Sequence, residues 1–288
     1  MTKKTAVLPA ETHIGRVHLK VSNLERALAF YQDLLGFHLA EQGGATAALS
    51  SGASEAVVLR LSAVQGAMRK PPRSSGLYHI AIRLPVRPAL GALLRRLLAA
   101  EYPLQGAADH LVSEAIYLAD PDGNGLELYI DRPREQWQQV SGVVQMATDP
   151  LDAVSLLEES KSYGADWHGI APGTDIGHVH LQVADLGAAE AFYCGLLGFT
   201  VTQRSYPGAL FVSAGGYHHH IGLNTWAGRG APPPPPEAVG LAYFRIEIPD
   251  PDTRSRLIER LETHQVRLES GENGNKLVYD PDSIAIEI

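Results

Sequence analysis

The stretch of sequence that decides the fold occurs twice in this chain. Residues 14–37 read IGRVHLKVSNLERALAFYQDLLGF, and residues 176–199 read IGHVHLQVADLGAAEAFYCGLLGF. Aligned without gaps, the two stretches share 15 of 24 residues. Each begins with alternating apolar residues, which predict a strand, and continues with apolar residues at a 3.6-residue period, which predict a helix. Asn23 and Asp185 are suited to cap these helices, and Gly36 and Gly198 to end them.

A second repeated motif lies near the end of each half. Asp120-Pro121-Asp122 stands five residues before Glu127, and Asp280-Pro281-Asp282 stands five residues before Glu287. The offsets of the two motifs, 162 and 160 residues, are nearly equal. The chain is therefore an internal duplication that keeps its register over nearly its whole length.

Each half divides again into two similar units. A strand-like run, GLYHIAIRL, occupies residues 76–84, and a helical stretch follows it at about residues 88–100. The pattern predicts a βαβββ module four times over, and hence an α+β fold of two cupped mixed sheets with helices on their outer faces. We expect a first domain at 1–131, a linker with a helix near residues 151–161 at 132–175, and a second domain at 176–288.

Composition excludes several classes of function. The 288 residues contain 24 Lys and Arg against 32 Asp and Glu, a net charge of −8, which argues against nucleic-acid binding. No stretch is apolar over the roughly 18 residues that a membrane span needs, and residues 1–11 do not form a signal peptide. A single cysteine, Cys194, suits a cytoplasmic protein. Twelve histidines stand out, so metal chemistry here would use imidazole and carboxylate ligands.

The polar faces of the predicted strands collect ligand-type side chains. Because strand side chains alternate, one face of 77–84 carries His79 while Tyr78 and Ile80 lie opposite. By the same rule 126–130 presents Glu127, 178–183 presents His180, and a strand at 218–224 presents His218 and His220. A single strand histidine is usually structural, but matching positions on several strands predict a metal-lined concave sheet.

At these residues the chain resembles the vicinal-oxygen-chelate superfamily, which has the glyoxalase/bleomycin-resistance/extradiol-dioxygenase fold. The resemblance covers nearly the whole chain and is closest to two-domain, catechol-2,3-dioxygenase-like ring-cleaving enzymes. The motifs that carry it are GLYHIAIRLP (76–85), DHLVSEAIYLADPDGNGLELY (109–129), IGHVHLQVADL (176–186) and GGYHHHIGLNTWAGRGAPP (215–233).

The resemblance implies a His, His, Glu metal site. It assigns His79, Glu127 and His180 as ligands. His110 would be an acid/base residue beside the site and Tyr117 a substrate contact. It also implies a proton-transfer histidine within 218–220, where strand parity allows His218 or His220 and the motif favours His220.

Which modules pair decides the third ligand. Consecutive pairing would give His18, whereas pairing of the second module with the third gives His180. We favour the second arrangement, because only it brings the proton-transfer histidine within 218–220 into the same cup as His79 and Glu127. In the other cup, Tyr243 occupies the position that corresponds to His79. Although Glu287 is kept there, we expect that cup to bind no metal.

The implied activity is that of an extradiol dioxygenase, which would use Fe(II), or less readily Mn(II), to insert O₂ into a catechol- or hydroquinone-type ring. The expected partners are the aromatic diol and O₂, and the edges of the sheets favour a homodimer. Two alternatives remain at this point. One is another metal-dependent enzyme of this fold, an isomerase or a thiol transferase, and the other is a non-catalytic resistance protein that binds aromatic compounds.

Overall fold

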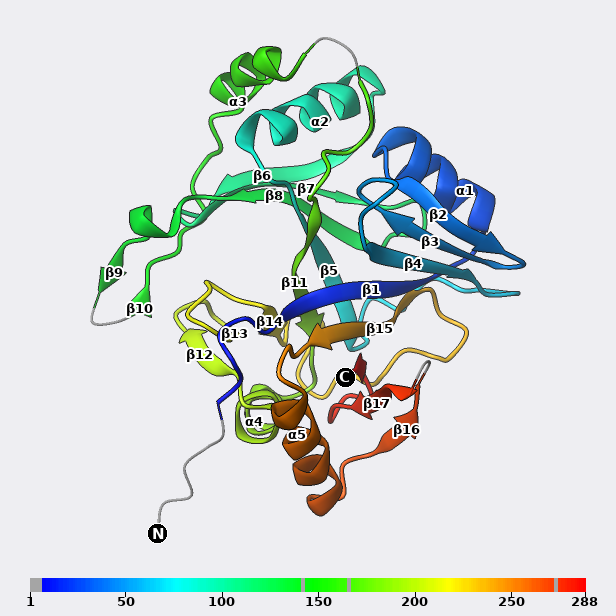
Figure 1. Cartoon of the computed structure of the whole chain (residues 1–288), viewed down its shortest axis with the longest axis vertical. Coiled ribbons are helices and arrows are strands. Elements are labelled where there is room, and N and C mark those ends of the chain that lie inside the picture. Colours follow the sequence, from blue (N-terminus) through cyan, green and yellow to red (C-terminus); the bar gives the residue numbers. More distant parts are fainter. Residues whose placement is uncertain (1–6, 141–142, 165–166, 272–273) are drawn as a thin grey trace.

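The computed structural model describes residues 7–140, 143–164, 167–271 and 274–288. Two eight-stranded mixed sheets form its centre, with the helices at the periphery (Figure 1). This confirms the predicted α+β class. Each sheet combines one module from each half of the chain. The first sheet joins modules one and four, and the second joins modules two and three. The non-consecutive pairing favoured from the sequence is therefore the one observed.

Both sheets are built around a central antiparallel pair. In the first sheet the order is β2 (His38–Gly43), β3 (Thr46–Ser50), β4 (Val57–Ala63), β1 (His13–Val21), β15 (Gly240–Glu247), β18 (Ala285–Glu287), β17 (Lys276–Tyr279) and β16 (Leu268–Ser270). In the second sheet it is β6 (Leu104–Asp109), β7 (Ser113–Ala119), β8 (Gly125–Asp131), β5 (Gly76–Arg83), β11 (Asp175–Gln182), β14 (Ile221–Asn224), β13 (Ala209–Ser213) and β12 (Thr200–Gln203). The pairs β1/β15 and β5/β11 are thus where the two halves of the chain meet.

The helices begin and end largely where the sequence predicted. They are α1 (Leu24–Leu28), α2 (Arg87–Ala99), α3 (Ala153–Glu159), α4 (Leu186–Glu190) and α5 (Pro251–Thr263), with π-helical turns at Ala29–Leu34 and Ala191–Leu197 and 3₁₀ turns at Arg134–Gln136 and Ser160–Tyr163. The Asn23 and Asp185 side chains accept hydrogen bonds from the first turns of α1 and α4. Gly36 and Gly198 follow the π-helical turns with φ of +84° and +98°.

The repeated Asp-Pro-Asp motif has a structural function. The hydroxyl of buried Tyr31, on the first repeat helix, donates to Asp120 over 3.0 Å, and Tyr193 donates to Asp280 over the same distance. Each motif therefore holds the turn before the last strand of one module against the helix of the preceding module in the same half of the chain. The apolar strand faces beneath these helices are closed to solvent, as in β1, where Val17, Leu19 and Val21 are fully buried.

The linker between the halves carries its helix close to the predicted place, followed by the 3₁₀ turn. It also contains a short hairpin, β9 (Gln139–Val140) with β10 (Val143–Val144), which the sequence did not indicate. Since each sheet takes a module from each half, the segments 1–131 and 176–288 describe the duplication and not two closed sheets.

Two strand predictions were wrong in detail. The strand expected at 218–224 begins only at Ile221, so the three histidines before it lie in a loop and do not alternate between faces. Tyr78 was expected on the helix side of its strand, but the pairing passes from His180↔His79 directly to Leu181↔Leu77. Tyr78 is therefore the extra residue of a β-bulge, which turns its side chain toward the cavity described below.

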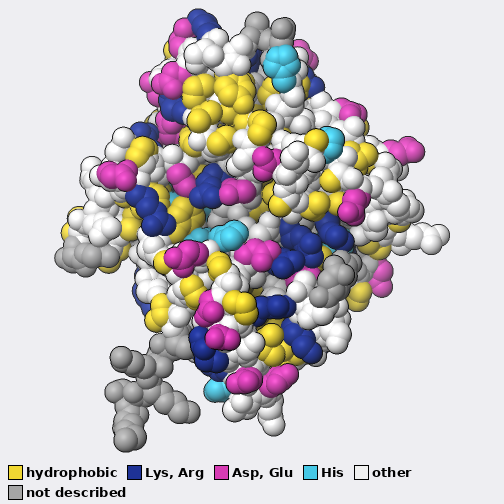
Figure 2. Space-filling model, viewed as in Figure 1, with side chains coloured by type: hydrophobic (Ala, Val, Ile, Leu, Met, Phe, Trp, Pro, Cys, Tyr) yellow, Lys and Arg dark blue, Asp and Glu magenta, His cyan; other side chains and the backbone are white. Residues whose placement is uncertain are grey.

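The face of the molecule in Figure 2 mixes acidic and basic side chains without a continuous basic stripe. Within the described residues, the helices lack the combination of length and apolar composition needed to traverse a bilayer.

Candidate metal centre and cavity

The centre of the second sheet places three potential ligands together. β5 lies between antiparallel β11 and parallel β8, with His180 opposite His79 and Glu127 opposite Ala81. A bulge at Gly177 in β11 brings His178 opposite Ala81 as well. Only glycine fits at this bulge, because a Cβ on residue 177 would lie 1.7 Å from the Tyr129 hydroxyl. The local sequence thus directs His178 toward Glu127.

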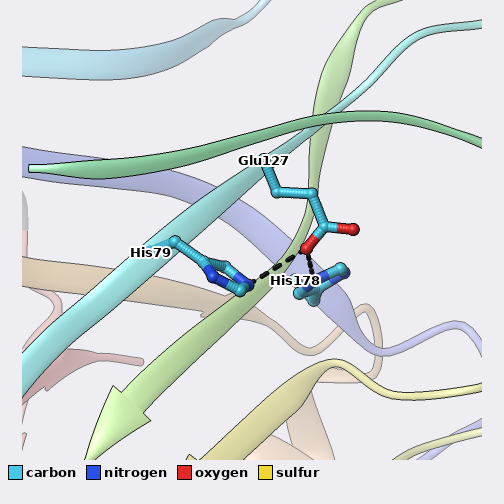
Figure 3. A group of neighbouring side chains, drawn as sticks. All are labelled: His79, Glu127 and His178. Carbon is cyan, nitrogen blue, oxygen red and sulfur yellow. Dashed lines mark hydrogen bonds and ion pairs between the residues drawn. The ribbon is translucent and has the colours of Figure 1, made fainter. Parts of the chain in front are cut away.

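The resulting group consists of His79, Glu127 and His178, whose ligand atoms all lie within 4.8 Å of one another. The Glu127 Oε2 atom is 3.1 Å from Nε2 of both histidines (Figure 3). All three side chains are buried. Burial alone would raise the pKa of Glu127, but His178 and His79 hold it well below its ordinary value. Burial lowers the pKa of His178 to about 4, so this imidazole is neutral at pH 7, as a metal ligand must be.

These residues fit a divalent metal ion. Nε2 of His79 is buried and makes no hydrogen bond within the described structure, although it lies 3.1 Å from the Glu127 carboxylate. This contact lacks the geometry of a good hydrogen bond, and a cation coordinated by both atoms would satisfy them. Two neutral imidazoles and one carboxylate are the ligand set of non-haem Fe(II) enzymes.

His180, the ligand expected from the sequence, lies beside this group. Its ring centroid is 5.0 Å from that of His79, but it is not one of the three residues whose ligand atoms converge. The ring packs among Tyr78, Phe211 and Trp226, and Gly222 on the neighbouring strand leaves room for it. The structure therefore brings together His79 and Glu127 as expected, with His178 nearer to them than His180.

A cavity of about 390 Å³ extends from this group. Its aromatic and apolar lining comprises Tyr78, Tyr117, Leu126, Met146, Tyr206, Phe211 and Trp226. Its ionisable lining comprises His79, His110, Glu127, His180 and His219, and Gln105, Ser113 and Thr148 add polar groups. Tyr78 and Trp226 are 42% and 49% exposed, so they mark its opening to solvent. Met146 and Thr148 come from the linker, which thus closes one side of the cavity.

His110 and Tyr117 form a pair in the cavity wall. The His110 Nδ1–H donates to the Ala147 carbonyl over 2.6 Å, so in the neutral ring Nε2 is an acceptor. The Tyr117 hydroxyl lies 2.6 Å from this Nε2 and donates to it. Burial and the nearby Glu127 carboxylate raise the pKa of Tyr117 well above its ordinary value, so the phenol stays protonated.

The three consecutive histidines have three different surroundings. His219 lines the cavity, and its ring stacks 4.0 Å from that of His178. His218 is fully buried and contacts Asp131. His220 does not line the cavity. Its Nδ1 accepts from the Ala214 N–H at 3.2 Å, and burial lowers the pKa of this ring to about 3.

The alternative ligand His18 lies in the other sheet. Its Nε2 is 2.7 Å from the Ser62 hydroxyl, and its ring meets that of Tyr243 edge-on at 4.9 Å. His18 is therefore separate from the group around His79. Nearby, Glu287 receives a hydrogen bond from Arg16, at 2.7 Å.

His178 and His219 were not among the residues predicted from the sequence. Strand alternation puts His178 on the same face as His180, and the resemblance assigned His180. A signal was nevertheless present, because the two repeats differ at position 178, with Arg16 as its counterpart. His219 was missed because residues 218–224 were expected to form one strand, in which His219 would point away from the face of His218 and His220.

Comparison with known proteins adds three findings. The family model described as Glyoxalase/Bleomycin resistance protein/Dioxygenase superfamily matches residues 13–128 and again residues 175–288. A protein named catechol-2,3-dioxygenase from Bacillus subtilis (strain 168) is 45% identical over 276 residues, which cover 94% of each chain.

Solved structures show the same fold at low sequence identity. A putative dioxygenase from Bacillus subtilis superimposes with a TM-score of 0.64 at 13% identity, covering 98% of this chain and 86% of that one. Glyoxalase I from Zea mays gives a TM-score of 0.56 at 15% identity, covering 96% of this chain and 92% of that one.

Proposed function

This chain belongs to the glyoxalase/bleomycin resistance protein/dioxygenase superfamily, and from that premise we propose that it is a ring-cleaving extradiol dioxygenase. Its substrate would be a catechol- or hydroquinone-type aromatic, into which the enzyme inserts O₂. The observation that carries the proposal is the convergence of His79, Glu127 and His178, two of which, His79 and Glu127, line a largely aromatic cavity. The 45% identity to a catechol-2,3-dioxygenase over nearly the whole chain supports the same activity.

We assign the three converging residues as the ligands of Fe(II), with Mn(II) as the second choice. When bound, the metal would lower the pKa of a catechol hydroxyl and supply positions for both reactants. His180, the ligand expected from the sequence, becomes in this assignment a wall of the cavity beside His79.

His219 is the best-placed residue to accept a proton from the substrate. It lines the cavity next to His178, and burial lowers the pKa of this ring well below its ordinary value, so the imidazole is neutral and has a lone pair that can accept a proton. The O–H bond of a substrate hydroxyl would break, with the proton passing to a ring nitrogen of His219. His220, which the motif favoured for this role, has its ring outside the cavity lining.

Tyr117 would orient the substrate through its hydroxyl oxygen. Because its O–H donates to His110, the remaining lone pair can accept a hydrogen bond from a substrate hydroxyl. His110 fixes this direction through its own bond to the Ala147 carbonyl.

The cavity lining favours an uncharged ring. Among the described residues that line it there is no Lys or Arg, while Glu127 lies within it. A carboxylate on the ring would lose its hydration without gaining a cation, which is costly. Apolar ring substituents would instead contact Tyr206, Phe211 and Trp226.

The test is anaerobic loading of the protein with Fe(II), followed by oxygen uptake with a panel of catechols and hydroquinones. We expect stoichiometric O₂ consumption and a yellow ring-opened product, with uncharged catechols turned over faster than carboxylated ones. Failure of every diol in the panel to consume O₂ would overturn the proposal, and the isomerase reaction would then be assayed. A homodimer and a cytoplasmic location remain predictions for gel filtration and cell fractionation.

A further inference from the structure

We propose that His218 and Asp131 are positioning residues, which fix His219 in the tautomer that can accept the proton of the substrate. The inference rests on the proposed function of the cavity and assigns a role to two side chains outside it.

Asp131 is the last residue of β8, and its carboxylate anchors the hydrogen bonds that lead through His218 to His219. Its carboxylate accepts from Nε2–H of His218 at 2.8 Å, from the Tyr217 hydroxyl at 2.9 Å and from Nη1 of Arg83 at 3.2 Å. Burial alone would raise the pKa of Asp131, but the hydrogen bonds from His218 and Tyr217 and the charge of Arg83 keep it below its ordinary value. The carboxylate is therefore ionised at pH 7 and acts only as an acceptor.

The direction of each hydrogen bond follows from that acceptor. Since Asp131 cannot donate, Nε2 of His218 must carry its proton, and in the neutral ring Nδ1 is then the acceptor. Nδ1 of His219 lies 2.8 Å from this atom, and with a neutral His218 ring it is the donor of this hydrogen bond. The proton of His219 is thus held on Nδ1, which leaves Nε2 with the lone pair that a general base needs.

Packing prevents the central ring from turning. His218 is fully buried, with the Tyr217 ring 4.1 Å and the Trp137 ring 5.4 Å from it. The His219 ring in turn lies between Phe211, at 4.9 Å, and His178, at 4.0 Å. A flip of either ring would break the 2.8 Å contacts without a replacement in this apolar and aromatic surrounding.

The fold itself does not require these imidazoles. In the second sheet Val179 pairs with Ile221, and in the first sheet its repeat counterpart Val17 pairs with Leu59. The residues before Leu59 that correspond to the three histidines are therefore Ala56, Val57 and Val58. The first sheet forms the equivalent strand without histidine, and among its described residues the group of three converging ligand-type residues is also missing, which ties the histidines to the chemistry of the second sheet.

Three variants test the inference in the full-length, Fe(II)-loaded enzyme. In Asp131→Asn the amide can donate to His218, which favours the wrong tautomer, so kcat should fall about 10- to 100-fold. His218→Leu removes the acceptor for His219, so its kcat should fall as far. His218→Asn keeps an acceptor oxygen near the position of Nδ1 and should recover at least about threefold over His218→Leu.

The controls separate positioning from a merely structural effect. Asp175→Asn removes the other carboxylate bound by Arg83 without touching His218, and kcat should stay within about twofold of wild type. In the His218→Leu background, Asp131→Asn should cost no more than about twofold, because the link to His219 is already cut. KM and bound metal should stay near wild type throughout. An equal loss from Asp131→Asn in both backgrounds would overturn the inference.

A direct reading of the tautomer does not depend on turnover. Nitrogen NMR of ¹⁵N-histidine-labelled protein, loaded with diamagnetic Zn(II), should show His219 protonated on Nδ1 in the wild type and redistributed in Asp131→Asn. A wild-type ring protonated on Nε2 would overturn the inference even if ring cleavage is observed. Absence of ring cleavage with the Nδ1 tautomer intact would instead count against the proposed function alone.

Discussion

The two sheets are built alike and differ at the positions that matter for chemistry. In the second sheet, β11 and β5 contribute His178 and His79, and β8 contributes Glu127. In the first sheet, the corresponding residues of β1, β15 and β18 are Arg16, Tyr243 and Glu287. The glutamate is kept in both, but the imidazoles are replaced by a guanidinium and a phenol.

The difference shows two ways to accommodate one buried carboxylate. An isolated buried anion costs several kcal/mol, so each cup must supply a positive partner. Arg16, 2.7 Å from Glu287, carries that charge permanently in the first sheet. In the second sheet the imidazoles of His79 and His178 flank Glu127, and the compensating charge can come from a metal ion. The two cups thus differ both at positions 16 and 178 and at positions 243 and 79.

The largest expected effect is loss of the metal from the second sheet. His178→Ala and His79→Ala each remove one of three ligands, so metal affinity should fall by more than about 100-fold and turnover should be abolished. Metal content after desalting measures this directly. Tyr243→Ala in the first sheet is the matched control and should keep its metal. His180→Ala separates the two candidate ligands, because retention of metal in His178→Ala but not in His180→Ala would restore His180 as the ligand.

The next effect concerns the proton-transfer residue. His219→Ala should retain its metal and lower kcat by about 10²- to 10⁴-fold, the usual contribution of a general base. His220→Ala should lower kcat much less, because that ring lies outside the cavity lining. Steady-state kinetics with metal analysis of both variants decides between them. A severe loss in His220→Ala with a mild one in His219→Ala would support the assignment made from the motif.

The sequence predicted what depends on regular periodicity. The duplication, the caps at Asn23 and Asp185 and the polar face with His79 and Glu127 all follow from repeating patterns, and the structure confirms their placement. Alternation fails where an extra residue enters a strand, as at Tyr78 and Gly177, or where a strand begins late, as at Ile221. Those irregularities depend on tertiary pairing, which one sequence does not display.

The two candidate ligands of β11 differ in how the duplication treats them. His18 and His180 occupy equivalent positions in the two repeats, and the shared histidine makes these positions stand out in the sequence. Yet a feature that both sheets keep serves the common fold at least as readily as the chemistry of one sheet. Arg16 and His178, where the repeats diverge, distinguish the two cups.

The third prediction concerns the ion pair between Arg16 and Glu287 in the first sheet. Arg16→Ala leaves Glu287, which is 1% exposed, without its closest cation, so the free energy of unfolding should fall by about 3 kcal/mol. Urea unfolding monitored by fluorescence measures the change. Arg204→Ala, which breaks the exposed pair with Glu190, is the control and should cost less than about 1 kcal/mol. Equal losses in the two variants would refute the special role of the buried pair.

The smallest effect compares the two Asp-Pro-Asp turns. Asp120 receives a hydrogen bond from the Asn124 side-chain amide at 2.8 Å, and Ile284, which occupies the corresponding place, offers Asp280 only its backbone N–H. Burial raises the pKa of both carboxyls, and that of Asp280 reaches about 7. The missing amide and the neighbouring Asp282 carboxylate both favour the protonated form of Asp280.

The sign of the pH effect follows from that proton. Between about pH 4 and pH 7 the folded chain keeps a proton on Asp280 that the unfolded chain releases, so the free energy of unfolding falls as pH rises. Asp280→Asn cannot titrate, so its decrease from pH 5 to pH 8 should be smaller than that of wild type by about 2 kcal/mol. Asp120→Asn should change the slope less. Urea unfolding across this pH range measures all three proteins, and parallel pH profiles for wild type and Asp280→Asn would show that Asp280 is ionised throughout.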